Sequence, residues 1–132
     1  MLLSKSQVTI EMILIIIFLI IFLTAFAGVV YYHLGHVYTE SVEFETKRIG
    51  NELAGQINLA LEEGNGYKKE YFLQEKIQGL EYNVTVDSIN GRIEVEVNGN
   101  TYFFPILTRN VSGNFSFGKN IIRNENGLII IE

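Results

Sequence analysis

A single uncharged stretch constrains this chain of 132 residues more than any other feature. Between Met12 and Thr39 there is no Asp, Glu, Lys or Arg, and the part from Met12 to Val30 is almost wholly apolar. About 20 apolar residues in a helix, at 1.5 Å per residue, cross the roughly 30 Å hydrocarbon core of a bilayer. A soluble core helix rarely lacks a polar face over this length. The stretch therefore predicts a membrane-compatible helix, too long for an ordinary secretory signal.

A glutamate, Glu11, stands directly before this apolar run. Insertion scales place the cost of a charged residue at the middle of a membrane helix at about 2.5 to 3.5 kcal/mol. A carboxylate at this place therefore requires a partner or a solvated position. Lys5 precedes the run, and Glu40, Glu43 and Glu45 follow it. The positive-inside tendency therefore places the N-terminus in the cytoplasm and the C-terminal part outside.

The rest of the chain is acidic and contains no cysteine. Beyond residue 31 there are 9 Lys and Arg against 14 Asp and Glu, so no basic patch indicates a nucleic-acid partner. The absence of cysteine excludes a disulfide framework and a thiolate metal site. A globular part of this chain must therefore be stabilised by packing alone.

Motifs for catalysis and cofactor binding are missing from the sequence. It contains no P-loop, no G-x-G-x-x-G, no H-E-x-x-H and no G-x-S-x-G pattern. His33 and His36 lie three residues apart after the apolar run, a spacing that could bind a metal ion with help from Glu40. Such histidines are more often interfacial or packing residues. We therefore expect neither an enzyme, nor a cofactor, nor a metal site.

A helical pattern continues beyond the membrane-compatible part. Apolar or small residues recur every three to five positions, at Val30, Leu34, Val37, Ser41, Phe44, Ile49, Leu53, Ile57 and Leu61. The first strong stop is Gly64-Asn65-Gly66. We predict one helix from about Gln7 to Glu63, apolar all round in its first half and amphipathic in its second half.

The residues after this stop are typical of strands. Apolar residues alternate with polar ones in two runs, at Tyr82, Val84 and Val86 and at Ile93, Val95 and Val97. Asn90-Gly91 between the runs is a signal for a two-residue turn. Asn98-Gly99-Asn100 turns the chain into a third run, Thr101 to Leu107, in which Pro105 indicates a strand end or edge. NENG at 124–127 links residues 120–123 to a closing strand, LIIIE. We predict four to six antiparallel strands that cover the second half of the helix.

Two apolar runs exceed what a sheet with one buried face requires. They are Tyr102-Phe103-Phe104 and Leu128 to Ile131. They belong either to central strands or strands covered by a loop, or to a contact with neighbouring copies of the chain.

Three N-glycosylation sequons lie in the C-terminal part. They are Asn83-Val-Thr85, Asn110-Val-Ser112 and Asn114-Phe-Ser116. They support an extracellular position for this part independently of the charges near the apolar run. Because some sequons arise by chance in a chain this rich in Asn, we expect about half of them to be modified.

The residues before the apolar run resemble the class III signal peptide of archaeal type IV pilin-like proteins. That motif has a lysine, a small residue and then Gln-x-Ser/Thr-x-Glu directly before the apolar segment, and it is matched by Lys5, Ser6, Gln7, Thr9 and Glu11. Ser6 is small, where the family most often has glycine. The head hairpins and the tail NVSGNFSFGKNIIRNENG also look like those of small archaeal pilin subunits.

This resemblance implies several partners that would act on the chain one after another. A membrane-embedded prepilin peptidase would cut between Ser6 and Gln7, so that Gln7 becomes the new N-terminus. An assembly platform and a cytoplasmic ATPase would then move subunits from the membrane into a helical filament made of other copies or related pilins. The expected fold is α+β and type IV pilin-like. It has a signal peptide at 1–6, an apolar transmembrane or filament-core helix at 7–31, its amphipathic continuation at 32–66 and an antiparallel β head at 67–132.

The same resemblance offers a role for Glu11. After cleavage, Gln7 carries a free α-amino group, and the carboxylate of one subunit could pair with the amine of the next. An unpaired charge is penalised in a core of low dielectric, so such a pair would select the axial register. The alternatives are that Glu11 stays solvated at the membrane face, or that Gln7 cyclises and loses its amine. Small residues at Thr24, Ala27, Gly28 and Gly35 would let helices approach closely.

The leading expectation is a structural subunit of an adhesion pilus, held in the membrane by one helix before assembly and located at the cell surface afterwards. A minor pilin or pseudopilin of a secretion-like machine has the same signature. Archaellins resemble this chain in the apolar helix but usually lack the Gln-x-Ser/Thr-x-Glu pattern. The alternative from another class is a monomeric membrane-anchored ectodomain that binds a sugar or a protein.

Overall fold

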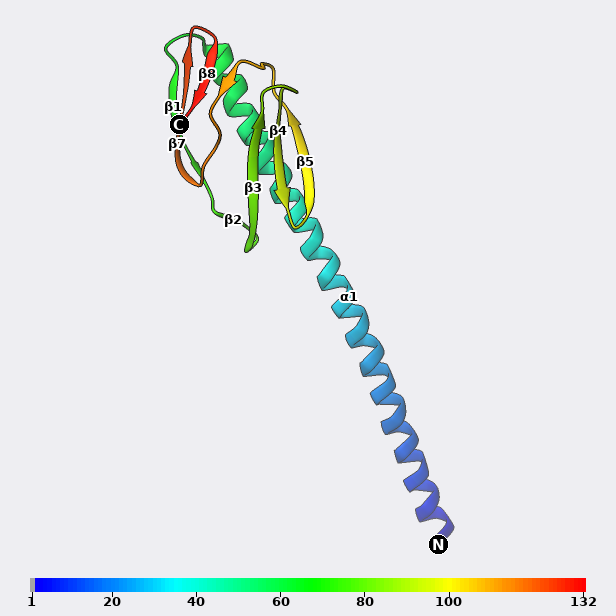
Figure 1. Ribbon diagram of the computed structural model, residues 1–132. Coiled ribbons are helices and arrows are strands. Elements are labelled where there is room, and N and C mark those ends of the chain that lie inside the picture. Colours follow the sequence, from blue (N-terminus) through cyan, green and yellow to red (C-terminus); the bar gives the residue numbers. More distant parts are fainter. Residues whose placement is uncertain (1) are drawn as a thin grey trace. The chain divides into compact units, whose positions relative to one another are not determined.

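The computed structural model describes residues 2–132, with side chains described from Ser4 onward. The described part of the chain is one long helix followed by a mainly antiparallel β region, which confirms the predicted α+β fold. The chain divides into an N-terminal unit, up to Glu40, and a C-terminal unit, Ser41–Glu132. Figure 1 shows the elements of both units along the chain.

Helix α1 comprises Leu2–Glu63. It begins before the predicted Gln7 and ends at the predicted Glu63, so the amphipathic continuation predicted to reach residue 66 stops three residues earlier. Gly64 explains the end, because its φ of 84° is left-handed and favours glycine after the last helical turn. The Asn124 side chain then donates a hydrogen bond of 2.8 Å to the carbonyl of Ala60, one of the last-turn carbonyls without a helical partner.

The β region consists of two four-stranded sheets within the described residues. The first sheet has the order β1-β7-β8-β6, and the second has the order β2-β3-β4-β5. The strand bounds are β1 Lys68–Leu73, β2 Lys76–Ile77, β3 Leu80–Asp87, β4 Arg92–Val97, β5 Asn100–Pro105, β6 Val111–Ser112, β7 Gly118–Glu125 and β8 Leu128–Ile131. The prediction of four to six antiparallel strands was therefore wrong in number, and β6 pairs with β8 in parallel.

The predicted hairpin is confirmed, but its turn is longer than predicted. In the register of β3 and β4, Val84 lies opposite Val95, and Asp87 pairs with Arg92. Four residues, 88–91, therefore connect the strands, instead of a two-residue Asn90-Gly91 turn. The reason is the Asp87 carboxylate, which accepts hydrogen bonds from the backbone N–H of Asn90 at 3.1 Å and from its side-chain amide at 2.6 Å. These bonds hold the pKa of Asp87 below its usual range.

The other turns and strand ends follow the sequence closely. Val97 pairs with Asn100 across a two-residue turn in which Asn98 has a φ of 51° and Gly99 a φ of 77°. Both values suit the type I′ turn that Asn-Gly favours. Pro105 is the last residue of β5, an edge strand of its sheet, as the missing N–H donor predicted.

The core lies between the second half of α1 and the two sheets (Figure 1). Ile49, Leu53 and Ile57 are almost completely buried, as predicted. Phe44, which we placed on the same stripe, is 71% exposed. At 3.6 residues per turn, a residue five positions before Ile49 lies about 140° away around the helix axis. The buried stripe instead continues through Thr46, whose hydroxyl donates to the carbonyl of Val42 at 2.7 Å.

The two apolar runs lie in different kinds of strand, one inside its sheet and one at an edge. The run Leu128–Ile131 forms β8, an inner strand of its sheet, so the central-strand alternative is confirmed for it. The other run lies in the edge strand β5, where Phe104 is buried but Phe103 is 54% exposed. The Arg92 guanidinium lies 4.2 Å from the centre of the Phe103 ring. This cation–π contact partly covers the ring.

Candidate functional site

The residues of the predicted cleavage and assembly motif lie in the first turns of α1, and all of them are exposed. The helix places Gln7 and Glu11 one turn apart on one face, where the Gln7 side-chain amide donates to a Glu11 carboxylate oxygen at 3.4 Å. The Thr9 hydroxyl donates to the carbonyl of Lys5 at 2.9 Å. Ser6 lies between these groups, so the predicted scissile bond is part of the helix.

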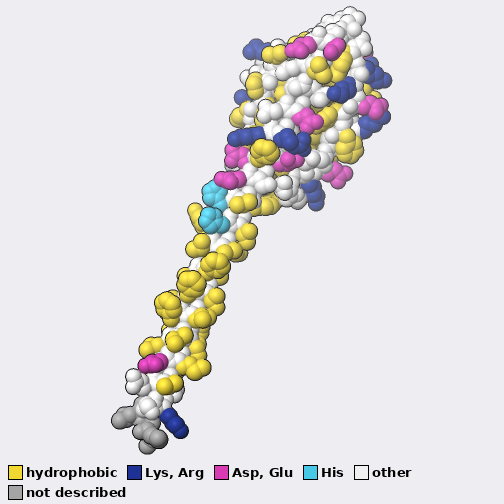
Figure 2. Space-filling model, turned by 180° about the vertical axis from the view of Figure 1, so that it is seen from behind, with side chains coloured by type: hydrophobic (Ala, Val, Ile, Leu, Met, Phe, Trp, Pro, Cys, Tyr) yellow, Lys and Arg dark blue, Asp and Glu magenta, His cyan; other side chains and the backbone are white. Residues whose placement is uncertain are grey.

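The apolar side chains that follow are exposed on every side of α1. The large apolar residues from Val8 to Val30 keep between 41% and 71% of their surface accessible. Figure 2 shows hydrophobic side chains over the visible surface of this segment. In the part of the chain that the structure describes, α1 is the one helix that is long and apolar enough to cross a membrane. Its length and composition are those of a membrane anchor or a signal segment.

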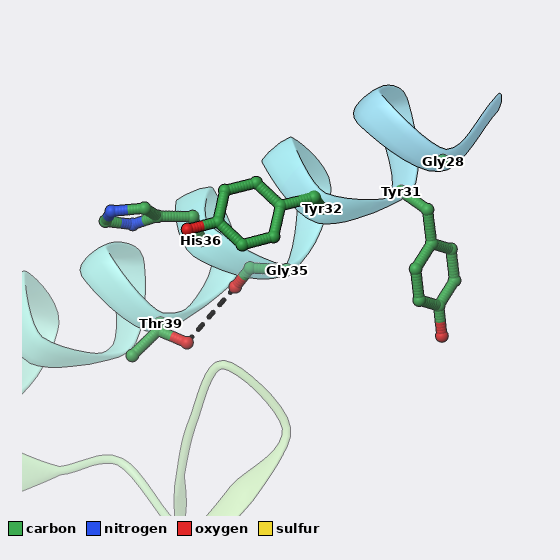
Figure 3. A pocket seen from close by; sticks show the side chains of 6 residues that line it. All are labelled: Gly28, Tyr31, Tyr32, Gly35, His36 and Thr39. Carbon is green, nitrogen blue, oxygen red and sulfur yellow. Dashed lines mark hydrogen bonds between the residues drawn. The ribbon is translucent and has the colours of Figure 1, made fainter. Parts of the chain in front are cut away.

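A shallow hollow lies on the surface of α1 at the end of the apolar run. It is formed where Gly28 and Gly35 lack side chains, and Tyr31, Tyr32 and His36 rise around them (Figure 3). No atom from elsewhere in the described chain would approach within 4 Å of a Cβ placed on either glycine. The hollow is therefore open to a partner outside the described residues. Tyrosines at the end of an apolar helix are also typical of the membrane–water interface.

The two histidines have separate contacts in the structure. His36 Nδ1 lies 3.5 Å from a carboxylate oxygen of Glu40. The His33 ring instead contacts Tyr32 edge-on, with 6.3 Å between ring centres. No group of three or more His, Cys, Asp or Glu side chains that could hold a metal ion occurs among residues 4–132.

The three sequon asparagines have exposed side chains in different environments. Asn83 lies on β3 opposite Glu96, on the solvent-facing side of the sheet. The Asn110 amide donates to the carbonyl of Gly127 at 3.2 Å. The Oδ1 and Nδ2 atoms of Asn114 both form hydrogen bonds with the backbone of strand β3.

A charged cluster joins the helix to β1 in the C-terminal unit. Arg48 pairs with Glu45 at 2.7 Å and with Glu52 at 3.0 Å. The hydrogen bond from Arg48 lowers the pKa of the Glu45 carboxyl. Burial raises the pKa of Tyr71 to about 12, with a further contribution from Glu52. The ion pairs of this cluster lie within α1, and the Tyr71 side chain of β1 lies beside Glu52.

Sequence reasoning missed the structural roles of three residues. Gly50 gives the Phe104 ring room against the helix backbone, because a Cβ there would lie 2.1 Å from a ring carbon. A lone glycine inside a helical pattern is the signal that could have indicated this contact. Asn114 and Asn124 bond to segments 28 to 64 residues away in sequence. Nothing in the local sequence marks such partners.

Comparisons of this chain with protein-family models, curated proteins and solved structures found no match.

Proposed function

We propose that this chain is a structural pilin subunit, cleaved between Ser6 and Gln7 by a prepilin peptidase and assembled through α1 into an extracellular type IV pilus for surface attachment. The observation that carries the proposal is the exposed apolar surface of α1 directly behind the Gln7–Glu11 motif. Such a surface needs an apolar cover, which lipid supplies before assembly and the same helices of other copies supply in a filament.

The placement of Glu11 supports assembly through paired charges. Gln7 and Glu11 lie on one face of α1 within hydrogen-bond reach of each other's side chains. After cleavage, the α-amino group of Gln7 would therefore lie at the start of the helix, about one turn from the Glu11 carboxylate. In a stack of subunits, the carboxylate of one copy could bind the amine of the next. Removing one partner of a desolvated charge pair is costly, so incorrect registers are disfavoured.

The hollow around Gly28 and Gly35 supports close packing of helices. Apolar side chains gain nothing from water exclusion when they exchange lipid for another helix, so association depends on close van der Waals contact and polar bonds. Two glycines seven residues apart lie on nearly the same face of a helix. Glycine costs about 1 kcal/mol relative to alanine inside a helix, and a backbone contact with another copy would offset that cost.

A second candidate is a membrane-anchored ectodomain that never polymerises. It is favoured by the length and composition of α1, which by themselves suffice for one membrane crossing. In that case the resemblance of the Lys5–Glu11 motif would be a coincidence. A minor pilin or a pseudopilin of a secretion-like machine would have the same N-terminal motif and the same helix.

N-terminal mass spectrometry on protein sheared from the surface of the native cell tests the proposal. A mature peptide that begins at Gln7, found in a high-molecular-weight fraction, is the expected result. A peptide that still contains Lys5 and Ser6, found only in the membrane fraction, would reject processing and favour the anchored ectodomain. A peptide that begins at Gln7 in monomeric protein would keep the peptidase and reject the polymer.

A further inference from the structure

The amide of Asn114 joins the two sheets of the C-terminal unit. Its Oδ1 accepts a hydrogen bond from the backbone N–H of Val86 at 2.9 Å, and its Nδ2 donates to the carbonyl of Val84 at 3.1 Å. Both partners belong to β3 in the second sheet, whereas Asn114 lies between β6 and β7 of the first sheet. The side chain therefore takes the place that a neighbouring strand would have on β3.

The pairing with one strand edge determines which amide hydrogen Asn114 uses. Val84 and Val86 are two residues apart, so their backbone groups point to the same edge of the strand. One amide reaches both groups only with the hydrogen that lies on the same side as Oδ1. An N-linked sugar occupies that position, because a substituted amide prefers the trans arrangement of a peptide bond. Glycosylation of Asn114 would therefore remove the hydrogen that binds Val84.

The segment after Asn114 is also held in place. Phe115 is buried and contacts Tyr71 edge-on, with ring centres 6.4 Å apart. The Asn120 side chain accepts from the backbone N–H of Ser116 at 2.8 Å and donates to its carbonyl at 2.7 Å. A sugar on Asn114 could not be accommodated by a local shift of this segment without breaking these contacts.

Asn83 has the opposite environment. Strand geometry places its side chain and the Thr85 hydroxyl on the same face of β3, because residues two apart share a face. Both side chains are exposed, and the cross-strand neighbours of this face are Glu96 and Glu94. A shallow depression beside Asn83, lined also by Asn98 and Gly99, leaves space for a first sugar. A glycan here would cover the outer face of the second sheet and disturb no core contact.

We propose that Asn83 is a glycan acceptor of this chain, and that Asn114 is kept unmodified because its amide clamps the two sheets together. The proposal concerns the folded protein, because a chain that carries a sugar on Asn114 could not form the hydrogen bond to Val84. It rests on the proposed location of the C-terminal unit outside the membrane, where N-glycosylation takes place.

Glycopeptide mass spectrometry on the native full-length protein tests both halves of the proposal. The expected result is a glycan on the peptide that contains Asn83 and an unmodified peptide around Asn114. A glycan on Asn114, or an unmodified Asn83 in protein recovered from the cell surface, would overturn it. The N-terminal peptide of the same sample reports separately on cleavage. An uncleaved chain with a glycan on Asn83 would therefore reject the pilus and keep this inference.

Paired variants at the two sequons distinguish the loss of a glycan from the loss of the hydrogen bonds made by Asn114. Asn83→Gln and Thr85→Ala should both lose the mass of one glycan. Asn114→Gln and Ser116→Ala should both keep the wild-type glycan mass. Asn114→Gln should also lower the midpoint of thermal unfolding by several degrees, whereas Ser116→Ala, which keeps the clamp, should leave it close to wild type. A loss of glycan mass in Ser116→Ala, or an unchanged midpoint in Asn114→Gln, would contradict the clamp.

Discussion

Replacing Gly50 by alanine should destabilise the C-terminal unit, although alanine is the better helix former. Gly50 lies inside α1, where this exchange normally gains about 1 kcal/mol. A Cβ at this position would lie 2.1 Å from Cε2 of Phe104 and 2.3 Å from two more atoms of the same ring. Carbon atoms in contact stand about 3.5 to 4.0 Å apart, so the ring would have to move by about 1.5 Å.

The surroundings of Phe104 leave little room for such a shift. Its side chain is only 5% exposed, and it belongs to the core cluster that the helix and the sheets share. Overpacking a well-packed core costs about 1 to 3 kcal/mol. With three ring atoms inside contact distance we take the upper end. After the helix gain is subtracted, Gly50→Ala should reduce the free energy of unfolding by about 2 kcal/mol. In a unit of this size that lowers Tm by roughly 8 to 16 °C.

Gly55 provides the matched control in the same helix. A Cβ at Gly55 would meet no atom within 4 Å from elsewhere in the described chain, so Gly55→Ala should raise the free energy of unfolding by up to about 1 kcal/mol. The assay is thermal unfolding of the full chain in detergent micelles, followed by the near-ultraviolet dichroism of its tyrosines. In a Phe104→Leu background, which lacks the Cε2 and Cζ atoms, Gly50→Ala should cost clearly less. If Gly50→Ala stabilised the protein as Gly55→Ala does, the close helix–sheet contact would be refuted.

Three further predictions follow from other contacts. Asn124→Ala should cost about 1 to 3 kcal/mol in chemical unfolding, because it leaves the buried Ala60 carbonyl without its donor; an unchanged midpoint would contradict the cap. Burial raises the pKa of Tyr82 to about 12, whereas an unfolded tyrosine ionises near pH 10. The raised pKa of Tyr82 therefore contributes fully to the free energy of unfolding below pH 10, and this contribution is lost as the pH rises to about 12. The loss is at most about 3 kcal/mol, and Tyr82→Phe should abolish it. Glu11→Gln should leave cleavage before Gln7 intact and sharply reduce the yield of sheared filaments. Glu62→Gln, which also removes one charge, should leave that yield unchanged. Normal filaments from Glu11→Gln would reject the charge pair.

Much of the fold could be predicted because its signals are local. The end of α1 follows from Gly64, and the register of Val84 against Val95 follows from simple alternation. The error at Phe44 arose from accepting a five-residue step, which moves a side chain to the other face of a helix. The turn after Asp87 was misjudged because a carboxylate at the strand end competes with the Asn-Gly signal.

The division of the β region into two sheets could not be read from the sequence. The first strand, KKEYFL, has two exposed lysines and no alternation of buried and exposed residues, so it gives no strand signal. Its position is determined by pairing with β7, about 50 residues later in the chain. The same is true of Asn114, which the sequence marks as a sequon and the structure places as a clamp on β3. Long-range partners decide both outcomes, and no local pattern encodes them.

The hydrophobic surface of α1 does not by itself distinguish the membrane from a filament. Burying each large side chain between Val8 and Val30 gains about 1.5 to 3 kcal/mol relative to water, which sums to tens of kcal/mol for the segment. Lipid and a bundle of like helices supply this gain equally well, so it cancels when a subunit moves from one to the other. Only features that lipid cannot satisfy favour the filament. In and just after this segment those include the carboxylate of Glu11 and the bare backbone at Gly28 and Gly35. Variants at these three positions should therefore affect polymer formation more than membrane insertion.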